Sequence, residues 1–181
     1  MGAAVVTPQG ALRAVLVVML VLVIQLTVGL DIRIVGAHPD FMVMLAIAVG
    51  LIGGPRRGAV AGFVVGMAAD LFLPGPFGLS ALVDTLIGFA AGNVPSRNDE
   101  GLWFVTPLAA LTLSAVAVML YAVLGALIGQ DQMLHVDVGV IVAVVAIANT
   151  IVSVPMRRLV GWAFGHGGNE RRRALVTGDR R

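Results

Sequence analysis

Two carboxylates lie within long apolar stretches of this 181-residue chain, at Asp70 and Asp84. Two acids held together inside a membrane are the catalytic groups of aspartyl intramembrane proteases, which carry Tyr-Asp and Gly-x-Gly-Asp motifs. In this chain Asp70 follows Ala69 and Asp84 follows Val83, so neither motif is present. The sequence therefore indicates that this pair of acids does not carry out proteolysis.

The other residue types give no catalytic or metal-binding pattern. The chain has no Cys, and its three His residues lie far apart without metal-ligand spacing. It contains no HExxH sequence, no Walker loop, no GxGxxG motif and no Ser-His pair. We expect no catalytic residue, no cofactor and no metal ion.

The composition places the chain in a lipid bilayer. Hydrophobic residues make up 59% of it and charged residues 12%, whereas an ordinary soluble domain has about 25% charged residues. The mean hydropathy is +0.99. A soluble fold of this length has too little interior to keep so many apolar side chains away from water. Soluble enzymes, nucleic-acid-binding proteins and secreted modules are therefore excluded.

Six apolar stretches follow one another along the chain. Each is expected to be a transmembrane helix, because backbone polar groups cannot stay unpaired in lipid. Their expected ranges are 14–30, 40–53, 58–73, 77–94, 103–128 and 138–164. The sequence thus predicts an all-α integral membrane protein, with a single six-helix transmembrane domain over residues 1–164 and a flexible basic cytoplasmic tail over 165–181. The first stretch exceeds the about 7–15 apolar residues of a signal peptide, so we expect it to remain as an anchor.

The second and third stretches are short, and a re-entrant pair is the alternative to two crossings. A re-entrant pair would bring Arg56 and Arg57 near the middle of the bilayer, at a cost of about 2.5–3.5 kcal/mol each. Two crossings place both side chains at an interface, where they reach water. The sequence favours two crossings.

Arginine sets the orientation. All 12 basic residues are Arg, and with six crossings Arg33 is the only one on the side opposite the two termini. Cytoplasmic segments of membrane proteins carry the excess of basic residues. We therefore expect a multi-pass protein of the bacterial cytoplasmic membrane with both termini in the cytoplasm.

Small residues recur at every fourth position along the third and fourth stretches, and residues four apart share one face of a helix. The rows are Gly58, Gly62, Gly66 and Asp70 on one stretch, and Ser80, Asp84, Gly88 and Gly92 on the other. Rows of small residues allow transmembrane helices to pack closely. Turn-forming residues, among them Gly75 and Gly78, separate the two rows.

These rows predict a tightly packed antiparallel hairpin centred on Gly75. In that register Gly58 faces Gly92, Gly62 faces Gly88, Gly66 faces Asp84, and Asp70 faces Ser80. The missing side chain of Gly66 would then make room for the carboxylate of Asp84. We expect the residues of both rows, together with Gly75 and Gly78, to form a helix-packing or partner interface.

Three interpretations remain open for the two acids. In the first, Asp70 accepts hydrogen bonds from the free N–H groups at the start of the next helix, aided by the helix dipole. In the second, Asp84 is protonated, because a low-dielectric interior disfavours its charged form. In the third, a partner protein supplies the opposite charge.

Asn149 lies midway along the last stretch. A polar amide inside a membrane commonly donates a hydrogen bond to another helix, which is worth about 0.6–2 kcal/mol. We expect Asn149 to contribute to helix packing rather than to bind a ligand.

The stretch from Pro39 to Gly92 resembles the MreD family of rod shape-determining proteins. The matching elements are Pro39-Asp40, Gly54-Pro55-Arg56-Arg57-Gly58, Gly62-Phe63 with Gly66, Asp70-Leu71, Pro74-Gly75, Gly78-Leu79-Ser80-Ala81-Leu82 and Gly88. Their order and spacing, rather than any single element, carry the resemblance.

The resemblance implies a non-catalytic subunit of the cell-elongation complex, which builds side-wall peptidoglycan and maintains cell shape. The implied partners are an MreC-like protein and, indirectly, a RodA-type polymerase, a transpeptidase and the cytoskeletal protein MreB. The family defines no catalytic residues. Asp70 and the glycine rows correspond to its recurrent motif, so we expect them to support folding or a helix–helix interface.

A second interpretation is a substrate-binding membrane subunit of an energy-coupling-factor vitamin transporter. Such subunits also have six spans, and MreD-like chains resemble their six-helix fold. They usually carry an Ala-x-x-x-Ala face in the first span, which this chain lacks between Ala14 and Leu30. The expected outer loops also lack aromatic groups suited to holding a vitamin.

Overall fold

The structure, a computed structural model, describes residues 8–29, 39–72, 75–95, 104–129 and 138–164. Every regular element in these ranges is helical, and each falls on one of the predicted stretches. The helices are α1 (Pro8–Ile24) with a π-helical continuation η1 (Gln25–Gly29), α2 (Phe41–Gly53), α3 (Pro55–Phe72), α4 (Leu79–Gly92), α5 (Val105–Leu127) and α6 (Val138–Ala163). The all-α prediction is confirmed for the described ranges. The predicted tail, 165–181, and Arg33 lie outside them.

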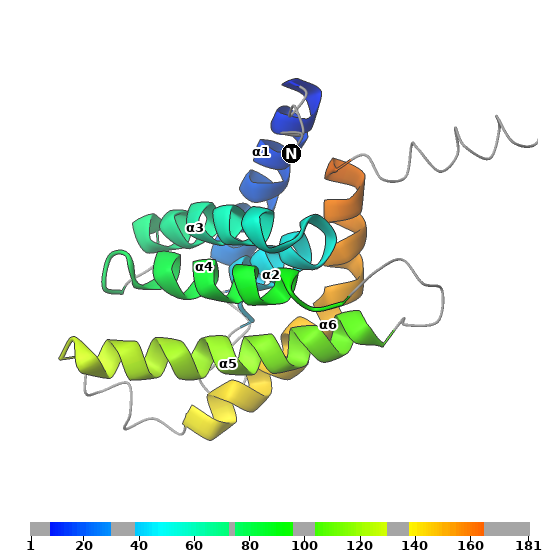
Figure 1. Cartoon of the computed structure of the whole chain (residues 1–181). Coiled ribbons are helices and arrows are strands. Elements are labelled where there is room, and N and C mark those ends of the chain that lie inside the picture. Colours follow the sequence, from blue (N-terminus) through cyan, green and yellow to red (C-terminus); the bar gives the residue numbers. More distant parts are fainter. Residues whose placement is uncertain (1–7, 30–38, 73–74, 96–103, 130–137, 165–181) are drawn as a thin grey trace, which may run out of the picture.

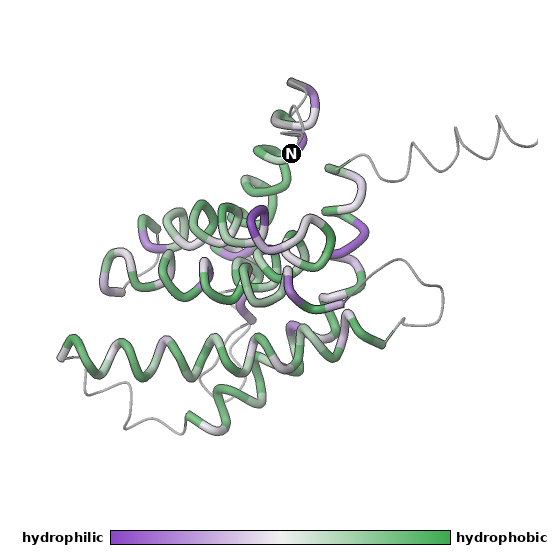
Figure 2. Tube along the Cα trace, viewed as in Figure 1, coloured by the Kyte–Doolittle hydropathy of each residue, from purple (hydrophilic) through white to green (hydrophobic). Residues whose placement is uncertain are grey.

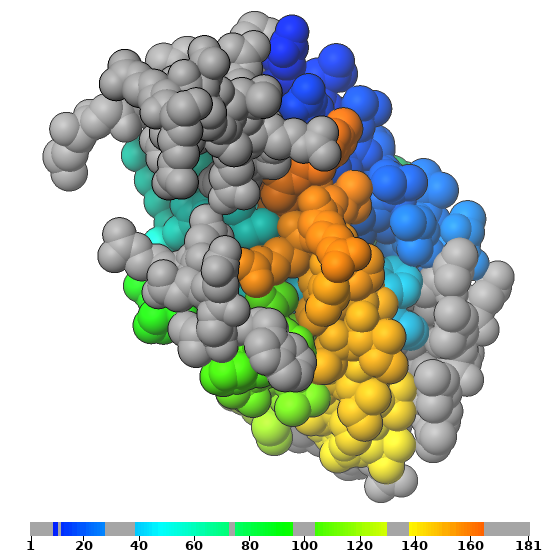
Figure 3. All heavy atoms as spheres, turned by 90° about the vertical axis from the view of Figure 1, so that its right-hand side faces the viewer, coloured from blue at the N-terminus to red at the C-terminus, as the bar shows by residue number. Residues whose placement is uncertain are grey.

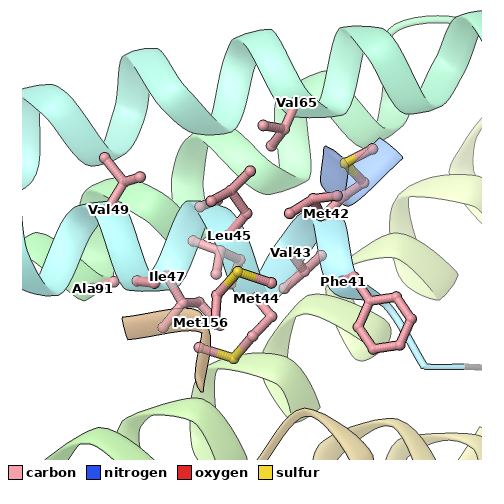
Figure 4. Close-up of a cluster of buried hydrophobic side chains, with 14 of the residues drawn as sticks. Phe41, Met42, Val43, Met44, Leu45, Ile47, Val49, Val65, Ala91 and Met156 are labelled. Atoms are coloured by element: carbon pink, nitrogen blue, oxygen red, sulfur yellow. The ribbon is translucent and has the colours of Figure 1, made fainter. Parts of the chain in front are cut away.

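Helix α2 is the core of the molecule. All residues from Phe41 to Leu51 are buried, and a helix that is apolar on every side is stable only when other elements surround it. Helices α1, α3, α4, α5 and α6 all contact it. Figure 4 shows its side chains pointing toward Val65 of α3, Ala91 of α4 and Met156 of α6.

Helices α3 and α4 form an antiparallel pair that packs along α2. Gly54, with a left-handed φ of 84°, joins α2 to α3 in a single residue, a conformation that glycine adopts without steric cost. Helix α5 lies beside α4, and α6 packs on both α5 and α2. Figure 1 shows α3, α4 and α5 running nearly parallel or antiparallel, whereas α1 and α6 cross them.

Large apolar side chains cover the outside of this bundle. Ile151 is 73% exposed and Leu71 is 65% exposed, whereas Asn149 and Ser153 are fully buried. Hydrophobic residues extend over most of each helix (Figure 2). This arrangement, with apolar groups outside and polar groups inside, is expected where the surrounding solvent is lipid.

By length and composition, α5 and α6 are able to cross a membrane. Three further helices are apolar but shorter: Leu12–Thr27, Phe41–Gly53 and Leu79–Gly92. Helix α3 carries Arg56, Arg57 and Asp70 within its 18 residues. Two spans are therefore supported by length alone, and the count of six remains a prediction.

Contacts between distant segments identify two opposite ends of the bundle. The Arg13 guanidinium of α1 lies 5.2 Å from the ring centre of Trp162 in α6, and that of Arg57 in α3 lies 5.5 Å from the ring centre of Phe164. Arg157 of α6 donates a 2.9 Å hydrogen bond to the hydroxyl of Thr106 in α5. These contacts bring the starts of α1, α3 and α5 to the end of α6. We call this the arginine end, defined by Arg13, Arg56, Arg57, Arg157 and Arg158.

The opposite end, where η1 meets α2 and α3 meets α4, is held by polar side chains that bind helix starts. We call it the capping end, defined by Gln25, Asp40 and Asp70. The described arginines and the two capping aspartates thus lie at opposite ends of the bundle.

Candidate functional site: the glycine contact and the capping end

Three glycines bring the backbones of α2, α3 and α4 into direct contact. A Cβ atom added at Gly58 would lie 2.7 Å from Gly50 Cα and 2.7 Å from the carbonyl carbon of Gly88. One added at Gly50 would lie 2.8 Å from the Ala91 Cβ. Real Cβ atoms essentially never approach other atoms this closely, so each position requires glycine for the helices to meet. We call Gly50, Gly58 and Gly88 the glycine contact.

The predicted register of the α3–α4 hairpin is wrong by four residues, one helical turn. Gly58 faces Gly88 rather than Gly92, and Gly62 faces the backbone of Asp84 rather than Gly88. A Cβ atom at Gly66 would lie 2.5 Å from the carbonyl oxygen of Ser80, so Gly66 does not face Asp84. The expected space for the Asp84 carboxylate beside Gly66 is therefore absent.

The cause of this shift is the position of the turn. The prediction placed the turn symmetrically about Gly75. In the structure, Gly78 N–H is hydrogen-bonded to Asp70 in the last turn of α3 before α4 begins at Leu79, and Gly66 faces Ser80. Gly92 consequently packs against Gly54 and Pro55, at the single-residue connection between α2 and α3.

Asp70 caps the start of α4 from the end of α3. Its Oδ2 atom accepts hydrogen bonds from the backbone N–H groups of Gly78 and Ala81, at 2.9 and 3.1 Å, and its Oδ1 atom accepts one from Ser80 at 3.1 Å. Because the N-cap residue is Gly78, with φ 90° and no side chain, Asp70 supplies the carboxylate that an N-cap Asp would otherwise supply. This geometry matches the first interpretation of Asp70, in which it accepts hydrogen bonds from the free N–H groups at the start of the next helix.

The start of α2 is held in the same way. The N-cap residue Asp40 accepts hydrogen bonds of 3.1 Å from both Met42 N and Val43 N. From η1, Gln25 Oε1 accepts a 2.8 Å bond from Phe41 N, and its Nε2 donates a 3.2 Å bond to Pro39 O. Gln25 is 1% exposed. The sequence alone assigns Gln25 no role. A single polar residue near the end of an apolar stretch is nevertheless a signal that its side chain binds the backbone of a neighbouring helix start.

Tyr121 of α5 joins the capping end to the rest of the bundle. A Cβ atom added at Gly75 would lie 2.7 Å from the Tyr121 hydroxyl. Gly75 therefore leaves room for the tyrosine. Sequence reasoning missed Tyr121 as part of this site, because its position within an apolar helix gives no indication of its neighbours.

Two of the predicted polar residues lie deeper between helices. Asp84 is 2% exposed on α4, with its backbone against Gly62. Asn149 of α6 is fully buried and donates a 2.9 Å hydrogen bond to Ser114 Oγ of α5, which is the interhelical contact expected of it. The other amide atom, Oδ1, has no hydrogen-bond partner among the described residues.

These polar groups bind backbone and neighbouring helices. Asp70 and Gln25 each use both of their terminal side-chain atoms to bind backbone groups at, or just before, the start of the following helix. Among the residues that the structure describes, no three His, Asp or Glu side chains are grouped to hold a metal ion. The arrangement is thus suited to fixing helices in place.

Comparison with known families gives one match. The family model described as rod shape-determining protein MreD matches residues 9–161, which include all six helices except a few terminal residues. No curated protein and no solved structure matches the chain. The family match extends well beyond residues 39–92, on which the sequence resemblance was based. The chain belongs to the MreD family of rod shape-determining membrane proteins.

Proposed function

We propose that this chain is a non-catalytic membrane subunit of the cell-elongation complex, where it supports side-wall peptidoglycan synthesis by binding an MreC-like protein. The family match supports the role in cell shape. The engagement of Asp70 with three backbone N–H groups of α4 supports a scaffold rather than an enzyme.

Catalysis requires polar groups that converge on space a substrate is able to enter. Gln25 and Asp40 are already bound to the start of α2, and Asp70 is bound to the start of α4. Each of these side chains would lose hydrogen bonds if it turned toward a substrate. The same groups hold four helices in a fixed arrangement, which a binding scaffold requires.

The proposal includes six membrane crossings and cytoplasmic termini. The contacts of Arg13 with Trp162 and of Arg57 with Phe164 support it, because they gather alternate helix ends at one side of the bundle. Helix α2 has only 13 residues, about 20 Å at 1.5 Å per residue. Since its neighbours surround it, α2 has little contact with lipid and need not match the bilayer thickness.

The proposed partners are an MreC-like protein in direct contact and, through the complex, a RodA-type polymerase, a transpeptidase and MreB. No cofactor is proposed. The lipid-facing helices present broad apolar surfaces on which a partner's transmembrane helix is able to pack.

Depletion in the native bacterium tests the proposal. We expect rod-shaped cells to become round or swollen, and an MreC-like protein to co-purify with the affinity-tagged chain from solubilised membranes. The control is the variant Gly139→Ala, expressed in the depleted cells. A Cβ atom at Gly139 meets nothing within 4 Å, so this variant should restore cell shape fully. Normal cell shape combined with a vitamin requirement would contradict the proposal and favour a transporter subunit.

A further inference from the structure

The arginine end carries positive charge that three helices bring together. Arg13 is on α1, Arg57 is in the first turn of α3, Trp162 is in the last turn of α6, and Phe164 directly follows that helix. Figure 3 shows the end of α6, in orange, beside α1, in blue, and near the teal atoms of α3. Segments about 150 residues apart in the sequence therefore form one surface.

Two guanidinium groups of this surface each lie over an aromatic ring, Arg13 over Trp162 and Arg57 over Phe164. Both lie within about 6 Å of a ring centroid, the range of a cation–π contact. A guanidinium carries five N–H donors, more than one aromatic contact engages, so donors remain for an acceptor. A planar donor group held in this way suits a phosphate, which accepts two parallel hydrogen bonds from one arginine.

In the part of the chain that the structure describes, the two capping aspartates do not neutralise this surface, and Asp84 is buried between helices. Asp40 and Asp70, the aspartates that cap α2 and α4, lie at the opposite end of the bundle. Arg56 and Arg158 are exposed at the same end as Arg13 and Arg57, which adds to the positive potential. Trp162 is 54% exposed, and partly exposed tryptophans are typical of the boundary between headgroups and acyl chains.

We propose that Arg13 and Arg57, held on Trp162 and Phe164, form a binding site for the phosphate of an anionic phospholipid headgroup. The site is distinct from a general attraction of basic residues to an anionic membrane, because it depends on two stacked arginines rather than on net charge. It rests on the membrane placement in the proposed function, but not on the role in cell shape.

Lipid titration of the purified full-length chain tests the site. Native mass spectrometry in detergent micelles measures the affinity for phosphatidylglycerol and, as a neutral control, phosphatidylcholine. An arginine and a phosphate joined by hydrogen bonds attract each other more strongly than the same charges without hydrogen bonds. We therefore expect the affinity for phosphatidylglycerol to fall about tenfold in the double variant Arg13→Gln/Arg57→Gln. The matched double variant Arg56→Gln/Arg158→Gln removes the same charge and should lose less than about threefold, because electrostatic attraction at the surface is partly screened.

Equal losses in the two double variants would overturn the proposal, since net charge would then account for binding. Equal affinity of the wild-type chain for phosphatidylcholine would also overturn it. Displacement of the lipid by millimolar inorganic phosphate would identify free phosphate as the ligand instead.

A second measurement needs no arginine variant. In a Trp103→Phe background, Trp162 is the only tryptophan, and brominated lipids quench tryptophan fluorescence on contact. We expect brominated phosphatidylglycerol to quench Trp162 more strongly than brominated phosphatidylcholine at the same mole fraction. Equal quenching would refute the site, whereas failure of the cell-shape experiment would leave this result unaffected.

Discussion

Two alanine substitutions of the same chemical type are expected to change stability in opposite directions. In Gly58→Ala, the added methyl group meets the backbones of α2 and α4, at 2.7 Å from Gly50 Cα and from the Gly88 carbonyl carbon. In Gly161→Ala, on α6, it meets nothing within 4 Å. Both changes remove a glycine from a helix, Gly58 from the start of α3 and Gly161 from the last turn of α6, which by itself stabilises by up to about 0.5–1 kcal/mol.

The clash at Gly58 sets the difference between the two variants. Ordinary contact lies at 3.4–4 Å, so the backbones must separate by roughly 1 Å, which forfeits about a quarter to a half of the dispersion energy between facing atoms. Overpacking of this kind costs about 1–3 kcal/mol. We therefore expect Gly58→Ala to be destabilised by about 1–2 kcal/mol after the gain in helix propensity, and Gly161→Ala to be stabilised by up to about 1 kcal/mol.

Unfolding by sodium dodecyl sulfate in mixed micelles, followed by circular dichroism, measures this difference. The wild-type chain and both variants should be compared in one detergent at one temperature. Equal stability of Gly58→Ala and Gly161→Ala would refute the reasoning, because it would mean that the α2, α3 and α4 backbones do not touch at the glycine contact.

Four other outcomes follow from the same contacts. Asp70→Ala should destabilise the chain by about 3 kcal/mol, since it removes three hydrogen bonds worth about 1 kcal/mol each, and Asp70→Asn should lose less because one acceptor oxygen remains; equal losses in detergent unfolding would contradict this. Gln25→Leu should weaken the start of α2 and increase hydrogen exchange at Phe41 N, whereas Thr27→Val, on the exposed side of the same helix, should not. Asp84→Asn should maintain rod shape in complementation, because it preserves size and polarity at a buried position; loss of shape at normal protein level would indicate a cationic partner. The chain has no Cys, so a single cysteine at His135 should react with an impermeant maleimide in cells with a permeabilised outer envelope, and one at His166 should not; the reverse pattern would overturn the proposed orientation.

The helices and the Asp70 cap were predictable because their signals are local. Each helix is an apolar stretch bounded by Gly, Pro or charged residues, and Asp70 lies near the end of one stretch with a turn-forming segment directly after it. A carboxylate close to free backbone N–H groups at a helix start is expected to accept hydrogen bonds from them.

The register and the third member of the glycine contact were not predictable from the same signals. Spacing fixes which residues share a face, but the path of residues 75–78 decides where two faces meet, and that path depends on hydrogen bonds to Asp70. Gly50 lies in a helix that is apolar on every side, so no periodicity marks the face it presents. Only the three-dimensional packing shows that Gly58 lies against α2 as well as against α4. Each of these two helices therefore has a glycine opposite Gly58, Gly50 in α2 and Gly88 in α4.

The direction of the capping bonds has a consequence for biogenesis. Gln25 holds the start of α2 and Asp70 holds the start of α4, so in both cases the side chain is synthesised before the N–H groups that it binds. A nascent chain therefore already contains the acceptor when the next helix leaves the ribosome, and the exposed donors at that helix start are paired as soon as the two segments meet. For α2 and α4, insertion from the N-terminus toward the C-terminus thus does not require the helix start to wait for a capping residue that has yet to be translated.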